Sequence, residues 1–156
     1  MTRSGRNALL TLPLAAVGLA VSAYLTYEHY SASATLACPD TGAVNCVKVT
    51  SSTWSELFGV PVALLGVLYY VAVVALCLPV AWRSGSRWVT RGRLLVLAGG
   101  VMTVLYLVWA ELFRIDAICL WCTAVHVVTV LLFGIVTVIA VLAVPAPASE
   151  DPVVSR

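Results

Sequence analysis

Four cysteines, arranged in two pairs, could carry out thiol–disulfide chemistry. Cys38 and Cys46 are separated by seven residues in a polar segment, and Cys119 and Cys122 form a C-x-x-C motif at the start of an apolar stretch. Two sulfurs three positions apart can close a small, strained ring, and such disulfides are reduced more easily than structural ones. The motif therefore indicates a redox-active pair. The alternatives are half of a metal site, which would need further soft ligands, and a chance spacing in an apolar helix.

The first pair lies in a segment with a strong turn signal, Pro39-Asp40-Thr41-Gly42, which brings Cys38 and Cys46 near one another. One interpretation is a structural disulfide, which is a modest staple when it closes so short a loop. The other is a mobile pair that exchanges with the C-x-x-C pair. The polar, turn-rich setting favours the second interpretation.

The elements that position these cysteines are expected to be membrane-spanning helices. The chain has 156 residues, of which 62% are hydrophobic and 10% charged, whereas an average soluble chain has roughly 25% charged residues. A span needs about 20 apolar residues, and four such stretches are expected, at about residues 9–27, 60–82, 94–113 and 117–144. The composition excludes a soluble domain. It predicts an all-α integral membrane protein, a four-transmembrane-helix bundle in which residues 1–144 form a single membrane domain and residues 145–156 a disordered cytoplasmic tail.

Basic residues predict the orientation, because cytoplasmic loops carry an excess of Lys and Arg. Seven of the nine basic residues fall on one side: Arg3, Arg6, Arg83, Arg87, Arg91, Arg93 and Arg156. Lys48 and Arg114 remain on the other side. Both termini are therefore expected in the cytoplasm, with all four paired cysteines on the outer face, where an oxidising compartment lets disulfides persist. Cys77, near the cytoplasmic end of the second stretch, is expected to be a packing residue.

Two local structures are predicted at the outer face. Thr53 and Glu56 have the spacing of a capping box, which predicts a short interfacial helix that extends through Phe58. Asp116 is a plausible N-cap of the fourth stretch, which would place Cys119 in the first helical turn. The unpaired N–H groups and the helix dipole would favour a thiolate there.

Ionisable residues inside apolar spans are candidates for function. His126 follows Cys122 by four residues and so shares its helix face, from which it could donate a hydrogen bond to a bound carbonyl. The alternative is a histidine that is hydrogen-bonded to a neighbouring helix. Glu111, about one turn from the outer end of the third stretch, is expected to extend to the interface. Ser52 either supplies a hydroxyl over a cavity or begins a helix.

Together these features resemble the vitamin K epoxide reductase (VKOR) family, particularly its short bacterial members without a fused thioredoxin-like domain. Cys38 and Cys46 follow the first stretch, Ser52 comes six residues after Cys46, and Trp54 two further on. Phe58-Gly59-Val60-Pro61 leads into the second stretch, and the C-x-x-C motif heads the fourth. The resemblance covers about residues 27–132.

The resemblance implies a helical bundle around a pocket for a quinone of the menaquinone, ubiquinone or vitamin K type, with no metal. By motif, Cys122 would face the quinone, Cys119 would exchange with Cys46, and Cys38 would meet the thiol partner. The quinone-binding residues expected in this pocket are Ser52, Trp54, Phe58, Val62 and His126. Val62 stands where animal members use an asparagine to hold a quinone carbonyl, which favours simple quinone reduction over epoxide chemistry.

The implied function is that of an enzyme, a quinone-linked thiol oxidoreductase. Electrons would pass from a separate thioredoxin-like (DsbA-like) dithiol protein through Cys38/Cys46 and Cys119/Cys122 to a membrane quinone, which would support disulfide formation. The expected location is the inner (cytoplasmic) cell membrane, multi-pass, with the active site on the outer face and no nucleic-acid partner. The alternative is a non-enzymatic membrane protein, either a metal carrier or a disulfide-stapled bundle. Another family of quinone-linked disulfide generators places its C-x-x-C motif in the first outer loop, the reverse of the order found here.

Overall fold

The computed structural model describes residues 2–31, 37–38 and 41–143. The predicted tail at 145–156 and the Pro39-Asp40 part of the predicted turn lie outside these described residues. In chain order the elements are α1 (Arg3–Ser31), α2 (Cys46–Thr50), the 3-10 helix η1 (Thr53–Ser55), β1 (Glu56–Leu57), β2 (Val60–Pro61), α3 (Val62–Cys77), α4 (Pro79–Arg83), α5 (Arg87–Ala110), the π-helical turn η2 (Glu111–Ile115) and α6 (Leu120–Leu142).

Within the described ranges, three helical segments are long and apolar enough to cross a membrane: α1, α5 continued by η2, and α6. Helix α3 is apolar but has only 16 residues. At about 1.5 Å per residue it rises about 24 Å, less than the roughly 30 Å of a hydrocarbon core. The predicted helical membrane class is confirmed, and the number of crossings stays a prediction.

The second predicted stretch, residues 60–82, is not one continuous helix. Leu78 is extended, with φ −58° and ψ 148°, because the ring of Pro79 disfavours helical backbone in the residue before it. Near this break the Leu76 carbonyl accepts two hydrogen bonds from the Arg93 guanidinium, at 3.0 Å and 2.8 Å. Arg93 is only 2% exposed, and its guanidinium lies 3.6 Å from the centre of the Trp82 ring. Arg93 therefore fastens α5 to the broken end of α3.

The predicted helix through Phe58 is wrong. The 3-10 turn η1 ends at Ser55, and the chain then forms a two-stranded hairpin in which Glu56 pairs with Pro61. The two residues at its tip, Phe58 and Gly59, both have positive φ, 56° and 76°, as in type I′ hairpin turns. Since Glu56 is extended, it does not take part in a capping box.

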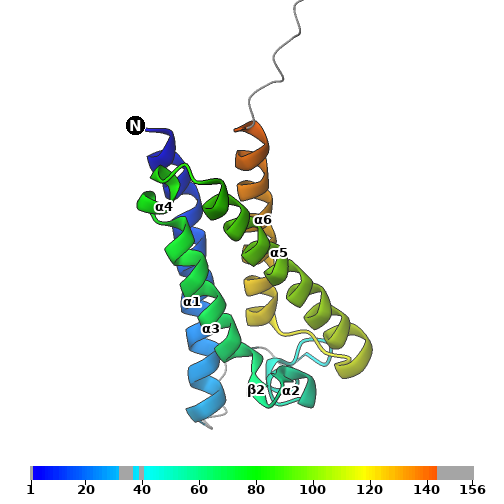
Figure 1. The fold of residues 1–156 in the computed structure, drawn as a ribbon. Coiled ribbons are helices and arrows are strands. Elements are labelled where there is room, and N and C mark those ends of the chain that lie inside the picture. The colour runs from blue at the N-terminus through cyan, green and yellow to red at the C-terminus, as the bar shows by residue number, and fades with distance from the viewer. Residues whose placement is uncertain (1, 32–36, 39–40, 144–156) are drawn as a thin grey trace, which may run out of the picture.

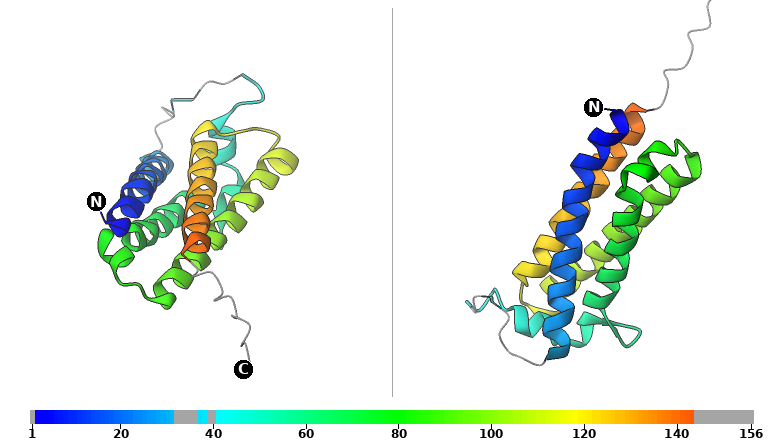
Figure 2. Two further views of the ribbon diagram at one scale, coloured as in Figure 1. Left: turned by 90° about the horizontal axis from the view of Figure 1, so that it is seen from above. Right: turned by 90° about the vertical axis from the view of Figure 1, so that its left-hand side faces the viewer.

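The helices form a bundle in which α1 packs beside α3 and α6, and α5 packs on α6 (Figures 1 and 2). The start of α1, the short α4 and the end of α6 lie at one end of the bundle (Figure 1). Helix α2, the β1–β2 hairpin and the connection between α5 and α6 lie at the opposite end. The bundle therefore has one end with short helical connections and one end built from irregular segments.

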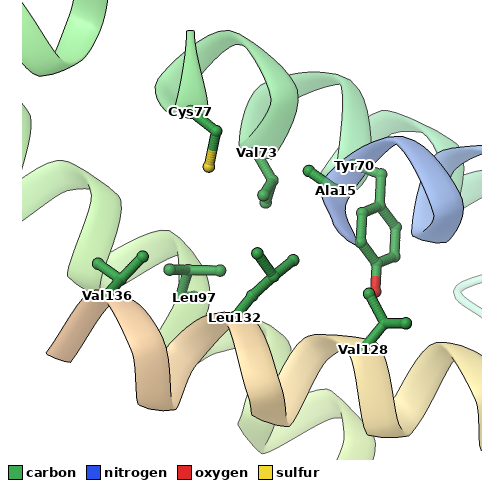
Figure 3. Packing of buried hydrophobic residues seen from close by; sticks show 8 residues of the cluster. All are labelled: Ala15, Tyr70, Val73, Cys77, Leu97, Val128, Leu132 and Val136. Carbon is green, nitrogen blue, oxygen red and sulfur yellow. The ribbon is translucent and has the colours of Figure 1, made fainter. Parts of the chain in front are cut away.

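The core lies between α1, α3, α5 and α6 (Figure 3). Its buried members are Ala15, Tyr70, Val73, Cys77, Leu97, Val128, Leu132 and Val136. Tyr70 points its hydroxyl towards α6, where it forms a 2.8 Å hydrogen bond with the Thr129 hydroxyl. Gly18 of α1 makes room for the same ring, because a Cβ at Gly18 would lie 2.0 Å from it. Cys77 is fully buried, as expected for a packing residue.

Candidate active site

Both cysteine pairs lie at the irregular end of the bundle, although they are far apart in the sequence. Cys38 and Cys46 form a disulfide with a Cα–Cα distance of 6.1 Å. Cys46 and Cys119 are both fully buried in one small cluster, and Cys38 and Cys122 pack against it. The cluster is completed by residues of α2 and of the connection between η2 and α6. The structure therefore brings the two predicted pairs together.

A short parallel β-bridge aligns the two pairs. Val44 pairs with Ile118, and Ile118 forms two backbone hydrogen bonds with the segment 43–45, of 2.9 Å and 3.1 Å. Cys46 follows Val44 by two residues, and Cys119 directly follows Ile118. Because the paired backbone leads straight into both cysteines, it holds Cys46 beside Cys119.

Three further hydrogen bonds fix this end of the molecule. The Asn45 side chain caps α2 by accepting from the Lys48 backbone N–H at 2.8 Å. The Lys48 ammonium donates to the Asp116 carbonyl at 3.3 Å. The Trp121 indole N–H donates to the Ala37 carbonyl at 3.2 Å. The last of these ties the residue before Cys38 to the first turn of α6.

Cys119 is the N-cap residue of α6, so the prediction that Asp116 caps this helix is wrong. The Cys119 sulfur accepts a hydrogen bond from the Cys122 backbone N–H at 3.3 Å. Asp116 has left-handed backbone, with φ 51°, and ends the turn η2. A hydrogen bond from the Cys122 thiol lowers the pKa of Cys119. The thiolate of Cys119 is thus stabilised by a backbone donor and a side-chain donor, which is the condition for a reactive cysteine.

A cavity of about 500 Å³ lies between the helices next to Cys122. Cys122 is among the residues that line it, and Cys119 is not. The walls come from α1, α3, α5 and α6 and from the segment 49–61, and they are mainly apolar. The polar side chains among them are Ser22, His29, Thr50, Ser55, Tyr69, Tyr70, Thr103, Tyr106, Glu111, His126 and Thr129. An apolar cavity of this size with few polar groups suits a small organic ligand.

Three of the predicted quinone-binding residues, Trp54, Val62 and His126, line the cavity. Ser52 does not, because its hydroxyl donates to the Val49 carbonyl at 2.8 Å, at the end of α2. Phe58 does not either, since it is 97% exposed at the tip of the hairpin. The roles of all five residues towards a quinone stay predictions.

Glu111 is buried, only 5% exposed, and lines the cavity together with Cys122 and His126. The prediction that it extends to the interface is wrong. The π turn that begins at Glu111 reverses the chain, and the Ala117 N–H donates to the Glu111 carbonyl at 3.2 Å. The connection between η2 and α6 is therefore bonded to Glu111, the residue that was predicted to extend to the interface. The one signal in the sequence was an ionisable residue inside an apolar span.

Other polar groups of the cavity were also missed from the sequence. His29 comes from α1, Thr50 and Ser55 from the segment after Cys46, and Tyr69 from α3. The Tyr69 hydroxyl is buried without a hydrogen-bond partner. Because buried hydroxyls normally have a partner, this group is available to a ligand. No pattern in the sequence separates Tyr69 from an ordinary core aromatic residue.

Across residues 2–31, 37–38 and 41–143, no group of three or more His, Cys, Asp or Glu side chains could hold a metal ion. The site consists instead of a disulfide, two neighbouring thiols and an apolar cavity, set in a helical membrane protein. These features define a class, the membrane proteins that carry out thiol–disulfide chemistry beside a site for an apolar ligand.

Comparison with known families identifies the group within this class. The chain matches the vitamin K epoxide reductase family over residues 9–137. It therefore belongs to that family, as the cysteine spacing predicted. The members of this family are quinone-linked thiol oxidoreductases of membranes, which generally work with a thioredoxin-like protein.

Proposed function

We propose that this protein oxidises a thioredoxin-like dithiol protein and passes the two electrons to a membrane quinone, and so supports disulfide formation. The observation that carries the proposal is the order of the four sulfurs. Cys38 is half-buried, Cys46 and Cys119 are buried side by side in one cluster, and Cys122 lines the cavity. This order supports a relay from the surface to the cavity.

The relay is a series of thiol–disulfide exchanges. A thiolate of the donor attacks Cys38, Cys46 leaves as a thiolate, and the second donor thiol then releases Cys38. Cys46 attacks Cys119 of the Cys119–Cys122 disulfide, and Cys122 leaves as a thiolate. Cys38 then attacks Cys46, which restores the Cys38–Cys46 disulfide and leaves Cys119 and Cys122 reduced.

The cavity supports the final step. A bound quinone would act as the electron acceptor, and it would be reduced to the quinol as the Cys119–Cys122 disulfide re-forms. The apolar walls fit a quinone ring, with Trp54 and Val62 as packing residues and His126 as a hydrogen-bond donor. The unpartnered Tyr69 hydroxyl offers a second donor. Val62 cannot hydrogen-bond a carbonyl, which supports quinone reduction rather than epoxide reduction.

We further propose a placement in the inner (cytoplasmic) cell membrane, with residues 1–144 as a single domain. In this placement α3 and α4 together make the second of four crossings in chain order, both termini are cytoplasmic, and the cysteines face outward. The support is that α4 and the start of α1 share the end of the bundle opposite the cysteines (Figure 1), and that Arg3, Arg6 and Arg83 lie in these segments.

The proposal is tested with the protein in lipid vesicles that contain a menaquinone or ubiquinone, supplied with a reduced thioredoxin-like donor. We expect quinol formation, which is followed by absorbance. Cys122→Ala should abolish it, and Cys77→Ala, in the core, should retain it. Quinol formation that persists in Cys122→Ala would reject the proposal.

A second measurement tests the order of exchange. Cys38→Ala removes the thiol that resolves the mixed disulfide, so a covalent Cys46–Cys119 bridge should accumulate and be found by mass spectrometry of the linked peptides. A metal carrier or a disulfide-stapled bundle would instead give no bridge and no quinol, and a carrier would be purified with bound metal.

A further inference from the structure

Glu111 is an ionisable group that has no role in the proposed sulfur relay. It lines the cavity beside Cys122 and His126. Together with His126 it also lines a second, mainly apolar cavity of about 460 Å³ between α5 and α6. Of the described residues that line the first cavity, Glu111 is the only carboxyl group. A carboxyl held between two apolar cavities needs an explanation, since charged groups are rarely buried without a partner.

The local backbone holds Glu111 against the C-x-x-C motif. The π turn η2 and the left-handed Asp116 fold the chain back, and the Ala117 N–H bonds to the Glu111 carbonyl. Glu111 shares the cavity wall with Cys122, and the Ala117 N–H that bonds to its carbonyl lies two residues before Cys119. The carboxyl group is thus held close to the C-x-x-C motif, where its charge opposes the Cys119 thiolate. Helical π turns are rare and frequently occur at functional sites.

Electrostatics then restricts where a proton can reside. A buried site stabilises two neighbouring negative charges poorly, so a thiolate and a carboxylate compete for one proton. When a thiol of the motif ionises, the adjacent carboxylate is the natural acceptor of its proton. The reaction needs such an acceptor, because closing the Cys119–Cys122 disulfide releases two protons and reducing a quinone to a quinol consumes two.

We propose that Glu111 is the proton-transfer residue of the C-x-x-C motif. It accepts the Cys119 proton as the Cys119–Cys122 disulfide re-forms with transfer of two electrons to the quinone, and it passes this proton towards His126. This inference rests on the proposed function. Two S–H bonds break and one S–S bond forms, and two electrons and two protons go to the quinone. One of the two protons travels through Glu111. The other titratable groups that face the cavity are His29 of α1, Tyr69 and Tyr70 of α3, and Tyr106 of α5.

The first test compares Glu111→Gln with Glu56→Gln in quinone-containing vesicles. Gln keeps the size of the side chain and removes its proton affinity, and Glu56 is an exposed carboxylate on the hairpin. Quinol formation should fall about 100-fold in Glu111→Gln, the usual effect of losing a general base, and stay unchanged in Glu56→Gln. The deficit should shrink as the pH rises, because hydroxide then removes the thiol proton. A deficit that is equal at every pH would indicate a structural role and overturn the inference.

The second test needs no quinone. The fully reduced protein is alkylated over a range of pH, and Cys119 is followed by mass spectrometry. The charge of Glu111 opposes the Cys119 thiolate, so the profile should move to lower pH in Glu111→Gln and stay in place in Glu56→Gln. A profile that does not move in Glu111→Gln would overturn the inference.

A third variant guards against misfolding. Glu111→Asp keeps a carboxyl group on a side chain that is one methylene shorter. Its rate of quinol formation should be at least tenfold higher than that of Glu111→Gln. Equal loss in both variants would overturn the inference. If the wild-type protein forms no quinol at all, the proposed function fails, whereas wild-type activity with an unaffected Glu111→Gln variant removes only the role of Glu111.

Discussion

At the residue scale, the two cysteines of the C-x-x-C motif differ in their surroundings. Cys119 caps α6 and is fully buried beside Cys46, whereas Cys122 lines the cavity. The backbone N–H and the thiol of Cys122 both donate to the Cys119 sulfur. The sulfur of Cys119 is therefore stabilised as a thiolate, and that of Cys122 is next to the cavity.

A substitution at Cys122 should change the acidity of Cys119. The hydrogen bond from the Cys122 thiol lowers the pKa of Cys119, so more Cys119 thiolate is present near neutral pH. In Cys122→Ala this donor is lost, the pKa rises, and the alkylation rate of Cys119 should increase only at higher pH. The measurement is the pH profile of iodoacetamide labelling of the Cys119 peptide.

The control is Cys77→Ala, which removes a buried thiol of the core and should leave the Cys119 profile in place. A Cys122→Ala profile that coincides with that of the wild type would show that the thiol of Cys122 does not stabilise the thiolate.

The placement of the candidate residues could be predicted where their spacing is informative. The two cysteine pairs lie together and His126 lines the cavity, while their chemical roles stay predictions. The placement of Glu111 could not be predicted, because its burial depends on the π turn after α5 and on the fold of the connection to α6. Ser52 was also ambiguous from the sequence, since its hydroxyl bonds the Val49 carbonyl at the end of α2.

At the element scale, the broken helix α3–α4 depends on Arg93. The Leu76 carbonyl near the break is satisfied by the Arg93 guanidinium. Arg93→Ala should lower the free energy of unfolding by about 1–3 kcal/mol, the usual cost of a buried acceptor left unpaired. The measurement is thermal or denaturant unfolding in detergent. Arg91→Ala, at an exposed arginine two residues earlier in α5, should change stability by less than about 0.5 kcal/mol.

A second prediction at this scale concerns the contact between α1 and α3. A Cβ at Gly18 would lie 2.0 Å from the Tyr70 ring, and Tyr70 cannot move freely because its hydroxyl is bonded to Thr129. Gly18→Ala should therefore destabilise the protein by about 1–3 kcal/mol, as overpacking does. Gly134→Ala in α6 is the matched control, since nothing lies within 4 Å of its added Cβ. Equal melting temperatures for the two variants would contradict the close packing of α1 on α3.

The long helices could be predicted from the sequence, but the points at which helices end could not. Apolar runs of about 20 residues indicated α1, α5 and α6, whose residues face either the core or lipid. The hairpin of β1 and β2 was missed because Phe58 adopts a positive φ, which bulky side chains seldom do. The break at Pro79 was missed because the residues on both sides of it, Leu78 and Val80, are apolar, so the hydropathy pattern gives no sign that the helix ends there.

At the scale of the whole molecule, the proposed orientation can be tested by labelling. In a variant without native cysteines, Ser51→Cys and Ser84→Cys place single thiols at opposite ends of the bundle, and both positions are exposed. A maleimide that does not cross membranes should label Ser51→Cys in intact cells. It should label Ser84→Cys only after the cells are made permeable. Labelling of both from the same side would refute a bundle that crosses the membrane between them.

The membrane class and the family could be predicted from the sequence, because hydropathy and the order of motifs each depend on many residues together. Hydropathy indicated the membrane, and the order of motifs indicated the family, which matches over residues 9–137. The orientation in the membrane, which the distribution of Arg supports, stays a proposal. The resemblance to the family implied a pocket, but most of its walls could not be predicted, since they combine side chains from four helices and from the segment 49–61.

The backbone pairing between Ile118 and the segment 43–45 has a consequence for the speed of turnover. The pairing uses no sulfur atom, so breaking the Cys38–Cys46 bond leaves it intact. Cys46 then remains the neighbour of Cys119 after it has become a free thiolate. Their reaction is intramolecular, with an effective molarity fixed by folding and not by collision. In the proposed relay, diffusion then governs only the arrival of the external donor at Cys38 and the exchange of quinone in the cavity.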